Sequence, residues 1–98
     1  MITRTEEIEG THLIGEVETT RAMLTAILGK PTEYEGGDKV TIEWGIKLGS
    51  TVATIYDWKR YEDGTPELHE VYAYHVGGRD ARALELVNGL LELGKKVL

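Results

Sequence analysis

The feature that most constrains the fold is a strict alternation of apolar and polar residues that ends at Leu48. Every second residue in this segment is apolar, namely Val40, Ile42, Trp44, Ile46 and Leu48. A period of two is typical of a strand with one buried face. Gly49 and Ser50 then read as a two-residue turn, because glycine tolerates the positive φ that such turns need. The sequence therefore predicts a hairpin of strands 39–48 and 51–58.

The turn sets the register of this hairpin, and the register decides which side chains are buried. It pairs Trp44 with Ile55 on the apolar face, and Glu43 with Tyr56 on the other face. Trp58 follows Tyr56 on that second face. A slip of one residue would exchange the two faces. The prediction that Tyr56 and Trp58 lie on the open face therefore depends on the turn.

Two segments have the periodicity of amphipathic helices. The first covers about residues 21–28, and Thr20 is its expected N-cap. The second covers about residues 81–93, with Asp80 as the expected N-cap and Gly94 as the expected C-cap. We expect both helices to cover the apolar face of the hairpin, because each carries one apolar stripe that must be buried.

Two further strands complete the predicted sheet. Residues 70–76 are rich in aromatic and β-branched side chains, and Gly77–Gly78 is expected to end this strand. A short strand is also predicted at 11–17, although glycine, here Gly15, disfavours strands. The sequence thus predicts an α+β fold, a small antiparallel sheet with two helices on one face, in a single domain of residues 1–98.

The composition excludes several classes of function. The net charge of −6 argues against binding to duplex DNA. The chain contains no cysteine, which excludes disulfides and thiol catalysis. It has no apolar run near 18 residues, so we expect no membrane span. Its first residues do not resemble a signal peptide. We therefore expect a soluble, cytoplasmic protein.

Catalytic and metal-binding motifs are not recognisable in the sequence. The one serine, Ser50, lies in the predicted turn. The three histidines, His12, His69 and His75, do not have the spacing of metal ligands. We therefore expect neither catalytic residues nor a metal or other cofactor.

The segment from Tyr56 to Arg60 and the segment around Gly77 are the candidate binding elements. Aromatic rings stack on nucleobases, and lysine or arginine side chains bind phosphate. A glycine pair before a helix exposes backbone N–H groups that favour an anion. The candidate ligand-binding residues are Tyr56, Trp58, Lys59, His75, Gly77, Gly78, Arg79 and Glu43.

The same residues have alternative explanations. Tyr56 and Trp58 also fit an interface between subunits, since exposed aromatic patches usually mark one. We therefore predict a homo-oligomer, most simply a twofold dimer. Asp57 falls on the buried face of the hairpin, where a carboxylate needs a partner. The expected partners are His75, Arg79 or Lys59.

Three stretches resemble a family of small proteins encoded by bacteriophages and prophages. They are TTRAMLTAILGKP, GDKVTIEWGIKLGSTVATIYDWK and YHVGGRDARALELV, and they span most of residues 11–93. The residues that match the family's motifs are Glu43, Trp44, Tyr56, Trp58, Lys59, His75, Gly77 and Gly78. The chain departs from the family pattern at residues 48–50, where an acidic turn is expected, and at Met23, where a capping glutamate is expected.

The resemblance implies a non-enzymatic protein that acts in the cytoplasm of a bacterial host and antagonises antiviral defence. One mode is sequestration of a nucleotide immune signal, which the aromatic and basic residues favour. The other is inhibition of a defence effector, such as a CRISPR nuclease, by an acidic surface that imitates nucleic acid. The net charge of −6 favours this second mode. A structural or regulatory phage protein is a third interpretation, and a small enzyme is a fourth.

Overall fold

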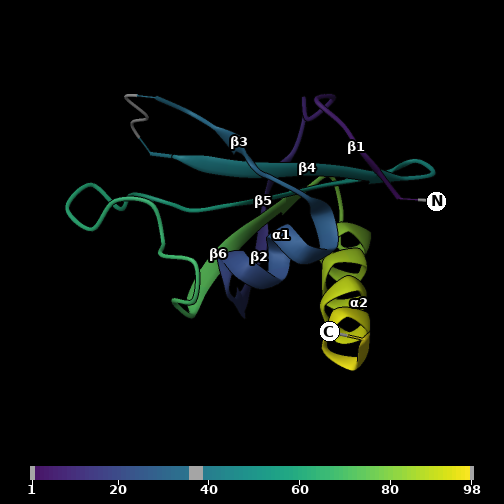
Figure 1. The fold of residues 1–98 in the computed structure, drawn as a ribbon. Coiled ribbons are helices and arrows are strands. Elements are labelled where there is room, and N and C mark those ends of the chain that lie inside the picture. The colour runs from purple at the N-terminus through teal and green to yellow at the C-terminus, as the bar shows by residue number, and fades with distance from the viewer. Residues whose placement is uncertain (1, 36–38, 98) are drawn as a thin grey trace.

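The structure, a computed structural model, describes residues 2–35 and 39–97. All strands pair antiparallel in one six-stranded sheet of order β1-β4-β5-β6-β2, with β3 also paired to β4 (Figure 1). The strands are β1 (Thr3–Arg4), β2 (His12–Thr19), β3 (Thr32–Glu33), β4 (Ile42–Leu48), β5 (Thr51–Tyr56) and β6 (Tyr72–Gly78). The helices are α1 (Arg21–Leu28) and α2 (Arg82–Val97). The predicted α+β class with a small antiparallel sheet is confirmed.

Both helices pack on the face of the sheet that carries Trp44, as predicted (Figure 1). Trp44 is 0% exposed, and its ring meets Tyr74 edge-on with 6.0 Å between centroids. Its indole N–H donates to the carbonyl oxygen of Gly29, just after α1, over 2.9 Å. Leu24 of α1 and Val87 of α2 pack into the same core. Trp44 thereby connects the sheet to the helical layer.

The hairpin has the predicted register. Trp44 lies opposite Ile55, and Glu43 lies opposite Tyr56. The strands are shorter than predicted: β4 begins at Ile42, β5 ends at Tyr56, and the first pair between them is Glu43 with Tyr56. β1 and β3, each two residues long, pair with the outer edge of β4 and were not predicted.

Two predicted ends are wrong. Gly77 and Gly78 continue β6 instead of ending it, and both pair with β2 and β5. The helix α2 continues through Gly94 to Val97. A Cβ at position 94 would overlap the side chain of Ile27, so this glycine permits close contact between α1 and α2. The predicted helix starts are better supported, since Asp80 Oδ1 accepts from the Arg82 N–H over 2.9 Å.

The face of the sheet opposite the helices is partly covered by residues 5–11, which we call the N-terminal strap (Figure 1). The strap lies against Gly45, which belongs to a row of small residues on the open face, since Gly45 is opposite Thr54 and Thr54 is opposite Gly77. A Cβ on Gly45 would overlap the carbonyl oxygen of Thr5. The Thr5 N–H donates to the Gly45 carbonyl oxygen over 3.0 Å. The absence of a side chain at Gly45 therefore lets the backbone of the strap lie against the sheet.

The hydroxyl of Tyr74 is buried and has no hydrogen-bond partner among the described residues. Burial raises the pKa of Tyr74 to about 12, against the opposing effect of the Arg21 charge. Between pH 10 and 12 the unfolded chain therefore loses a proton that the folded chain keeps, and stability falls as pH rises through this window. We expect Tyr74→Phe to increase the free energy of unfolding by about 1 kcal/mol at neutral pH.

Urea denaturation of Tyr74→Phe at pH 7 and at pH 10–12 checks this expectation. The variant should also lose less stability than the parent protein on the alkaline side. A loss of stability at pH 7 would mean that the hydroxyl makes a favourable interaction in the folded state.

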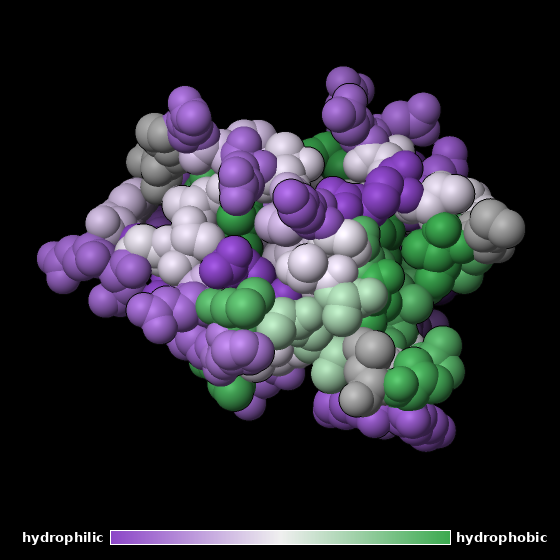
Figure 2. Space-filling model, viewed as in Figure 1, coloured by the Kyte–Doolittle hydropathy of each residue, from purple (hydrophilic) through white to green (hydrophobic). Residues whose placement is uncertain are grey.

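The surface of the helical layer carries an apolar area, visible as the green region over α2 in Figure 2. A shallow groove between α1 and α2 is lined by Ala26, Ile27, Leu90, Leu93, Gly94 and Val97. Leu93 and Val97 are exposed. No helix in the described ranges is long and apolar enough to cross a membrane.

Candidate functional site

Four side chains form a row across the open face of the sheet, beside the N-terminal strap. From β2 to β4 they are Glu16, His75, Tyr56 and Glu43. Each lies directly opposite the next in the backbone register, so all four point to the same face. His75 Nε2 lies 3.3 Å from Glu16 Oε2. We call these four residues the cross-strand row; it has a carboxylate at each end and two rings in the middle.

Trp58 adds a third ring to the middle of the row. Its ring stacks on His75 with an interplanar angle of 23° and 5.7 Å between centroids. Tyr56 meets Trp58 edge-on at 6.1 Å and His75 at 5.6 Å. The ammonium groups of Lys39 and Lys59 lie 5.8 and 5.7 Å from the Trp58 centroid. The half-buried Tyr56, Trp58 and His75 form what we call the aromatic cluster.

Tyr34 holds the carboxylate at the β4 end of the row. Its hydroxyl donates to Glu43 Oε1 over 2.8 Å. Burial and this contact with Glu43 raise the pKa of Tyr34 to about 12, with a smaller contribution from the charge of Glu6. Burial and the Glu43 charge also raise the pKa of Tyr56. Both phenols therefore stay neutral at pH 7 and can act as hydrogen-bond donors.

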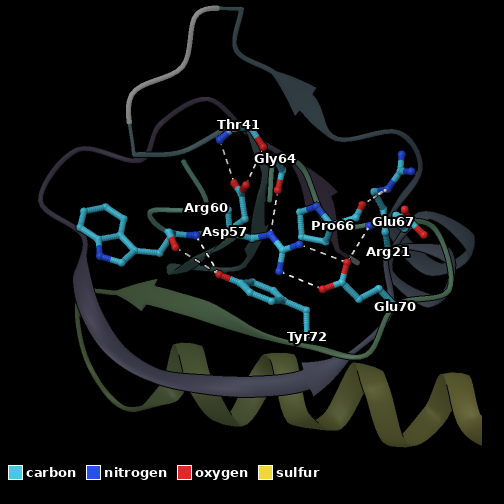
Figure 3. A network of polar contacts seen from close by, with 10 residues as sticks. Arg21, Thr41, Asp57, Arg60, Gly64, Pro66, Glu67, Glu70 and Tyr72 are labelled. Atoms are coloured by element: carbon cyan, nitrogen blue, oxygen red, sulfur yellow. Dashed lines mark hydrogen bonds and ion pairs between the residues drawn. The ribbon is translucent and has the colours of Figure 1, made fainter. Parts of the chain in front are cut away.

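Asp57 anchors the segment that carries Trp58, but its partners differ from those predicted. The carboxylate is 0% exposed. Its Oδ1 accepts from the Thr41 backbone N–H over 2.8 Å, and its Oδ2 accepts from the Thr41 hydroxyl (Figure 3). Oδ1 also accepts from the Ile42 N–H over 3.0 Å. The expectation of a His75, Arg79 or Lys59 partner is therefore wrong. Backbone N–H groups at the start of β4 satisfy this buried charge instead.

A second part of the same polar network fixes the loop after Trp58 (Figure 3). The Trp58 N–H donates to the Tyr72 hydroxyl over 3.0 Å. Arg60 lies over the Tyr72 ring, 4.9 Å from its centroid, and binds both carboxylate oxygens of Glu70 at 2.9 and 3.1 Å. A hydrogen bond from the Glu67 N–H and, to a smaller extent, the hydrogen bonds from Arg60 hold the pKa of Glu70 below its usual range. The backbone of Trp58 is thus held in place by side chains of β6 and the loop.

Lys59 has an unusual backbone conformation. Its φ is 53°, the one positive φ of a non-glycine residue in the described ranges. The left-handed region is costly for residues other than glycine, asparagine and aspartate. The Lys59 N–H donates to the Lys39 carbonyl oxygen over 2.8 Å, which brings the two lysine backbones together. A lysine at a position that glycine would occupy with less strain points to a role for its ammonium group.

Three of the predicted site residues are engaged elsewhere. A Cβ on Gly77 would overlap the Thr54 hydroxyl, and a Cβ on Gly78 would overlap Ala83 of α2, so both are packing positions inside β6. They do not form the predicted turn. The Arg79 guanidinium donates to the Glu9 carbonyl oxygen over 3.0 and 3.2 Å. It therefore ties the strap to the end of β6.

The other five predicted residues lie together in the structure. They are Glu43, Tyr56, Trp58, Lys59 and His75. The assembled groups are ring faces, carboxylate acceptors and ammonium donors, which is the chemistry of non-covalent recognition. Within the described ranges, no group of three His, Asp or Glu side chains is close enough to hold a metal ion.

Three members of the site were not predicted from the sequence, namely Glu16, Tyr34 and Lys39. Glu16 joins through the pairing of β2 with β6, which comes from strands far apart in the chain. Tyr34 and Lys39 both precede β4; Tyr34 lies outside any periodic segment, and Lys39 is the first residue of the predicted strand 39–48. The sequence signal that could have identified Tyr34 and Lys39 is the presence of aromatic residues and lysines just before and just after the hairpin.

Comparison of the chain with models of protein families, with curated proteins and with solved structures gives no match.

Proposed function

We propose that this protein is a non-enzymatic binding protein whose aromatic cluster holds a nucleotide-type ligand. The observation that carries the proposal is the half-exposed Trp58 ring with two lysine ammonium groups within 5.8 Å of its centroid. Stacking on an aromatic side chain contributes ~1–3 kcal/mol per base. Lysine binds phosphate as a flexible point charge. A nucleotide is the ligand class that uses both a ring face and adjacent positive charge.

The resemblance to small phage proteins supplies the biological setting of this proposal. A phage protein that holds a nucleotide without converting it would sequester an immune signal of the bacterial host. Sequestration requires a high affinity for the ligand and many copies of the protein, but no catalytic group. It therefore agrees with a site built from rings, carboxylates and ammonium groups. We place this activity in the host cytoplasm.

Two substitutions, Trp58→Ala and Lys59→Gly, test the proposed site. Trp58→Ala removes the stacking ring and should weaken nucleotide binding about tenfold or more. Lys59→Gly removes one ammonium group and relieves the backbone strain, so stability should stay equal or rise by about 1 kcal/mol. Its nucleotide affinity should nevertheless fall about threefold, the scale of one exposed charge contact.

The matched control is Tyr61→Ala, which removes an aromatic ring that is 61% exposed and outside the aromatic cluster. Binding is measured by calorimetry with ribonucleoside monophosphates, cyclic dinucleotides and ADP-ribose. A ligand at 100 times its Kd should also stabilise the fold by ~2.7 kcal/mol in a thermal-shift assay. If Lys59→Gly and Trp58→Ala both keep the parent affinity, the site is elsewhere. Arg79→Ala is unsuitable here because it would also release the strap.

A second candidate function is inhibition of a defence effector through the acidic surface. The loop between β5 and β6 exposes Glu62, Asp63 and Glu67, whereas Glu70 is paired with Arg60. Charge reversal of the three exposed acids tests this alternative. Loss of anti-defence activity in that variant, with nucleotide binding intact, would favour the inhibitor over the nucleotide-binding protein.

The homo-oligomer stays a prediction. The strap covers part of the open face, and the rings of the aromatic cluster pack against one another, so less apolar surface is left there than the sequence indicated. The groove between α1 and α2 offers a second apolar surface. Size-exclusion chromatography with light scattering decides between a monomer and the expected dimer.

A further inference from the structure

We infer that the base held by the aromatic cluster is guanine and that Glu43 selects it, an inference that rests on the proposed nucleotide function. Glu43 lies directly opposite Tyr56, so its carboxylate borders the cluster. Tyr34 donates to its Oε1 over 2.8 Å. Among the described residues, no donor contacts Oε2. The carboxylate is thus oriented on one side and open to a ligand on the other.

The hydrogen-bonding capacity of a carboxylate decides which base it can recognise. An ionised carboxylate only accepts hydrogen bonds, and its two oxygens can accept two parallel N–H groups. Guanine presents two such adjacent donors, at N1 and at the exocyclic 2-amino group. Adenine presents a lone pair at N1, which a carboxylate would repel. Charge-assisted bonds of this kind are the stronger class of hydrogen bond in proteins.

Glu43 lies between the aromatic cluster, through its pairing with Tyr56, and a cavity that none of the three rings of the cluster lines. A cavity of about 260 Å³ lies between the strap and the start of β4. Glu43 and Tyr34 line it together with Thr5 and Ile8 of the strap and Thr32 of β3. Partial enclosure lowers the local dielectric constant and strengthens polar contacts in the cavity. Glu6 also lines the cavity, and its negative charge favours a ligand whose edge carries hydrogen-bond donors.

The row contains its own control, because it has a second carboxylate. Glu16 lies at the β2 end and is paired with His75 Nε2 at 3.3 Å. It is not beside the cavity that Glu43 lines. Removing the charge of Glu16 should therefore change the local charge equally but leave base selection unchanged.

The experiment compares GMP, IMP and AMP by calorimetry on the full chain. GMP and IMP differ only in the 2-amino group, so their affinity ratio reports the second hydrogen bond to Glu43. We expect GMP to bind about tenfold more tightly than IMP, which is about 1.4 kcal/mol. In Glu43→Gln this ratio should fall towards one, while AMP affinity should rise, because the repulsion between the carboxylate and the adenine N1 lone pair is removed. In Glu16→Gln the ratio should stay at the parent value.

Tyr34→Phe provides a second variant that keeps the charge of Glu43 but removes the group that orients it. The GMP to IMP ratio should fall here as well, with an unchanged thermal unfolding midpoint as evidence of folding. Equal binding of all three nucleotides by the parent protein overturns the guanine inference and leaves the nucleotide function standing. Binding of none of them, nor of any other nucleotide, overturns both.

Discussion

Replacing Trp44 with alanine is expected to lower the free energy of unfolding by about 3–5 kcal/mol. The ring is 0% exposed, contacts Tyr74 edge-on and lies among side chains of both helices. Its loss leaves a large cavity and deprives the Gly29 carbonyl oxygen of its indole donor. Such a loss is a large part of the total stability of a small domain. Urea denaturation followed by circular dichroism measures it.

Trp58→Ala is the matched control for Trp44→Ala, because it removes the same side chain from the half-buried aromatic cluster. We expect this control to lose clearly less stability, since solvent can fill the space of the ring. A loss below 1 kcal/mol for Trp44→Ala, or an equal loss for both variants, would contradict the assignment of Trp44 to the centre of the core.

The second large effect is expected for Asp57→Ala, at about 3 kcal/mol. The substitution leaves the N–H groups of Thr41 and Ile42 without their acceptor in a buried place. Asp57→Asn retains an oxygen at Oδ1 for both N–H groups, and its amide can donate to the Thr41 hydroxyl. This conservative variant should lose less than about 1 kcal/mol. Urea denaturation of both variants gives the comparison.

The order of these two variants is the decisive outcome. If Asp57→Asn is as unstable as Asp57→Ala, the negative charge itself supports the fold, because it strengthens the hydrogen bonds from Thr41 and Ile42. Asp57→Ala should also broaden the amide signals of Trp58, because the carboxylate anchors the segment that carries this ring to the start of β4.

Local patterns in the sequence predicted the hairpin and α1 well. The alternation up to Leu48 and the turn at Gly49 determine the register, since a slip would bury Glu43 and expose Trp44. Thr20 and Gly29 mark the ends of α1, and both cap it in the structure. These features depend on neighbours in the chain, which is why one sequence was sufficient to predict them.

The errors come from residues whose role is decided by distant parts of the chain. Gly78 resembles the end of a strand, but it is small because Ala83 of α2 packs against it. Gly94 resembles a helix C-cap, but Ile27 of α1 lies against it. The N-terminal strap has no periodicity, and its one sequence signal is the small residue Gly45 on the open face.

The candidate site was predicted where it depends on the hairpin and missed where it depends on other pairings. Tyr56 and Trp58 share a face because they are two residues apart, and His75 joins them through the pairing of β5 with β6. Asp57 was recognised as needing a partner. The identity of that partner could not be predicted, because two backbone N–H groups of β4 carry no side-chain signature.

The most direct test of the central claim is a titration of the ¹⁵N-labelled protein with GMP, followed through the two tryptophan indole N–H signals. The Trp58 signal should shift progressively and saturate, because the base stacks on this ring. The Trp44 signal should stay in place, because its indole N–H is bonded to Gly29 inside the core. If neither signal moves at about 5 mM GMP, AMP, CMP or UMP, or if only Trp44 responds, the aromatic cluster is not a nucleotide site.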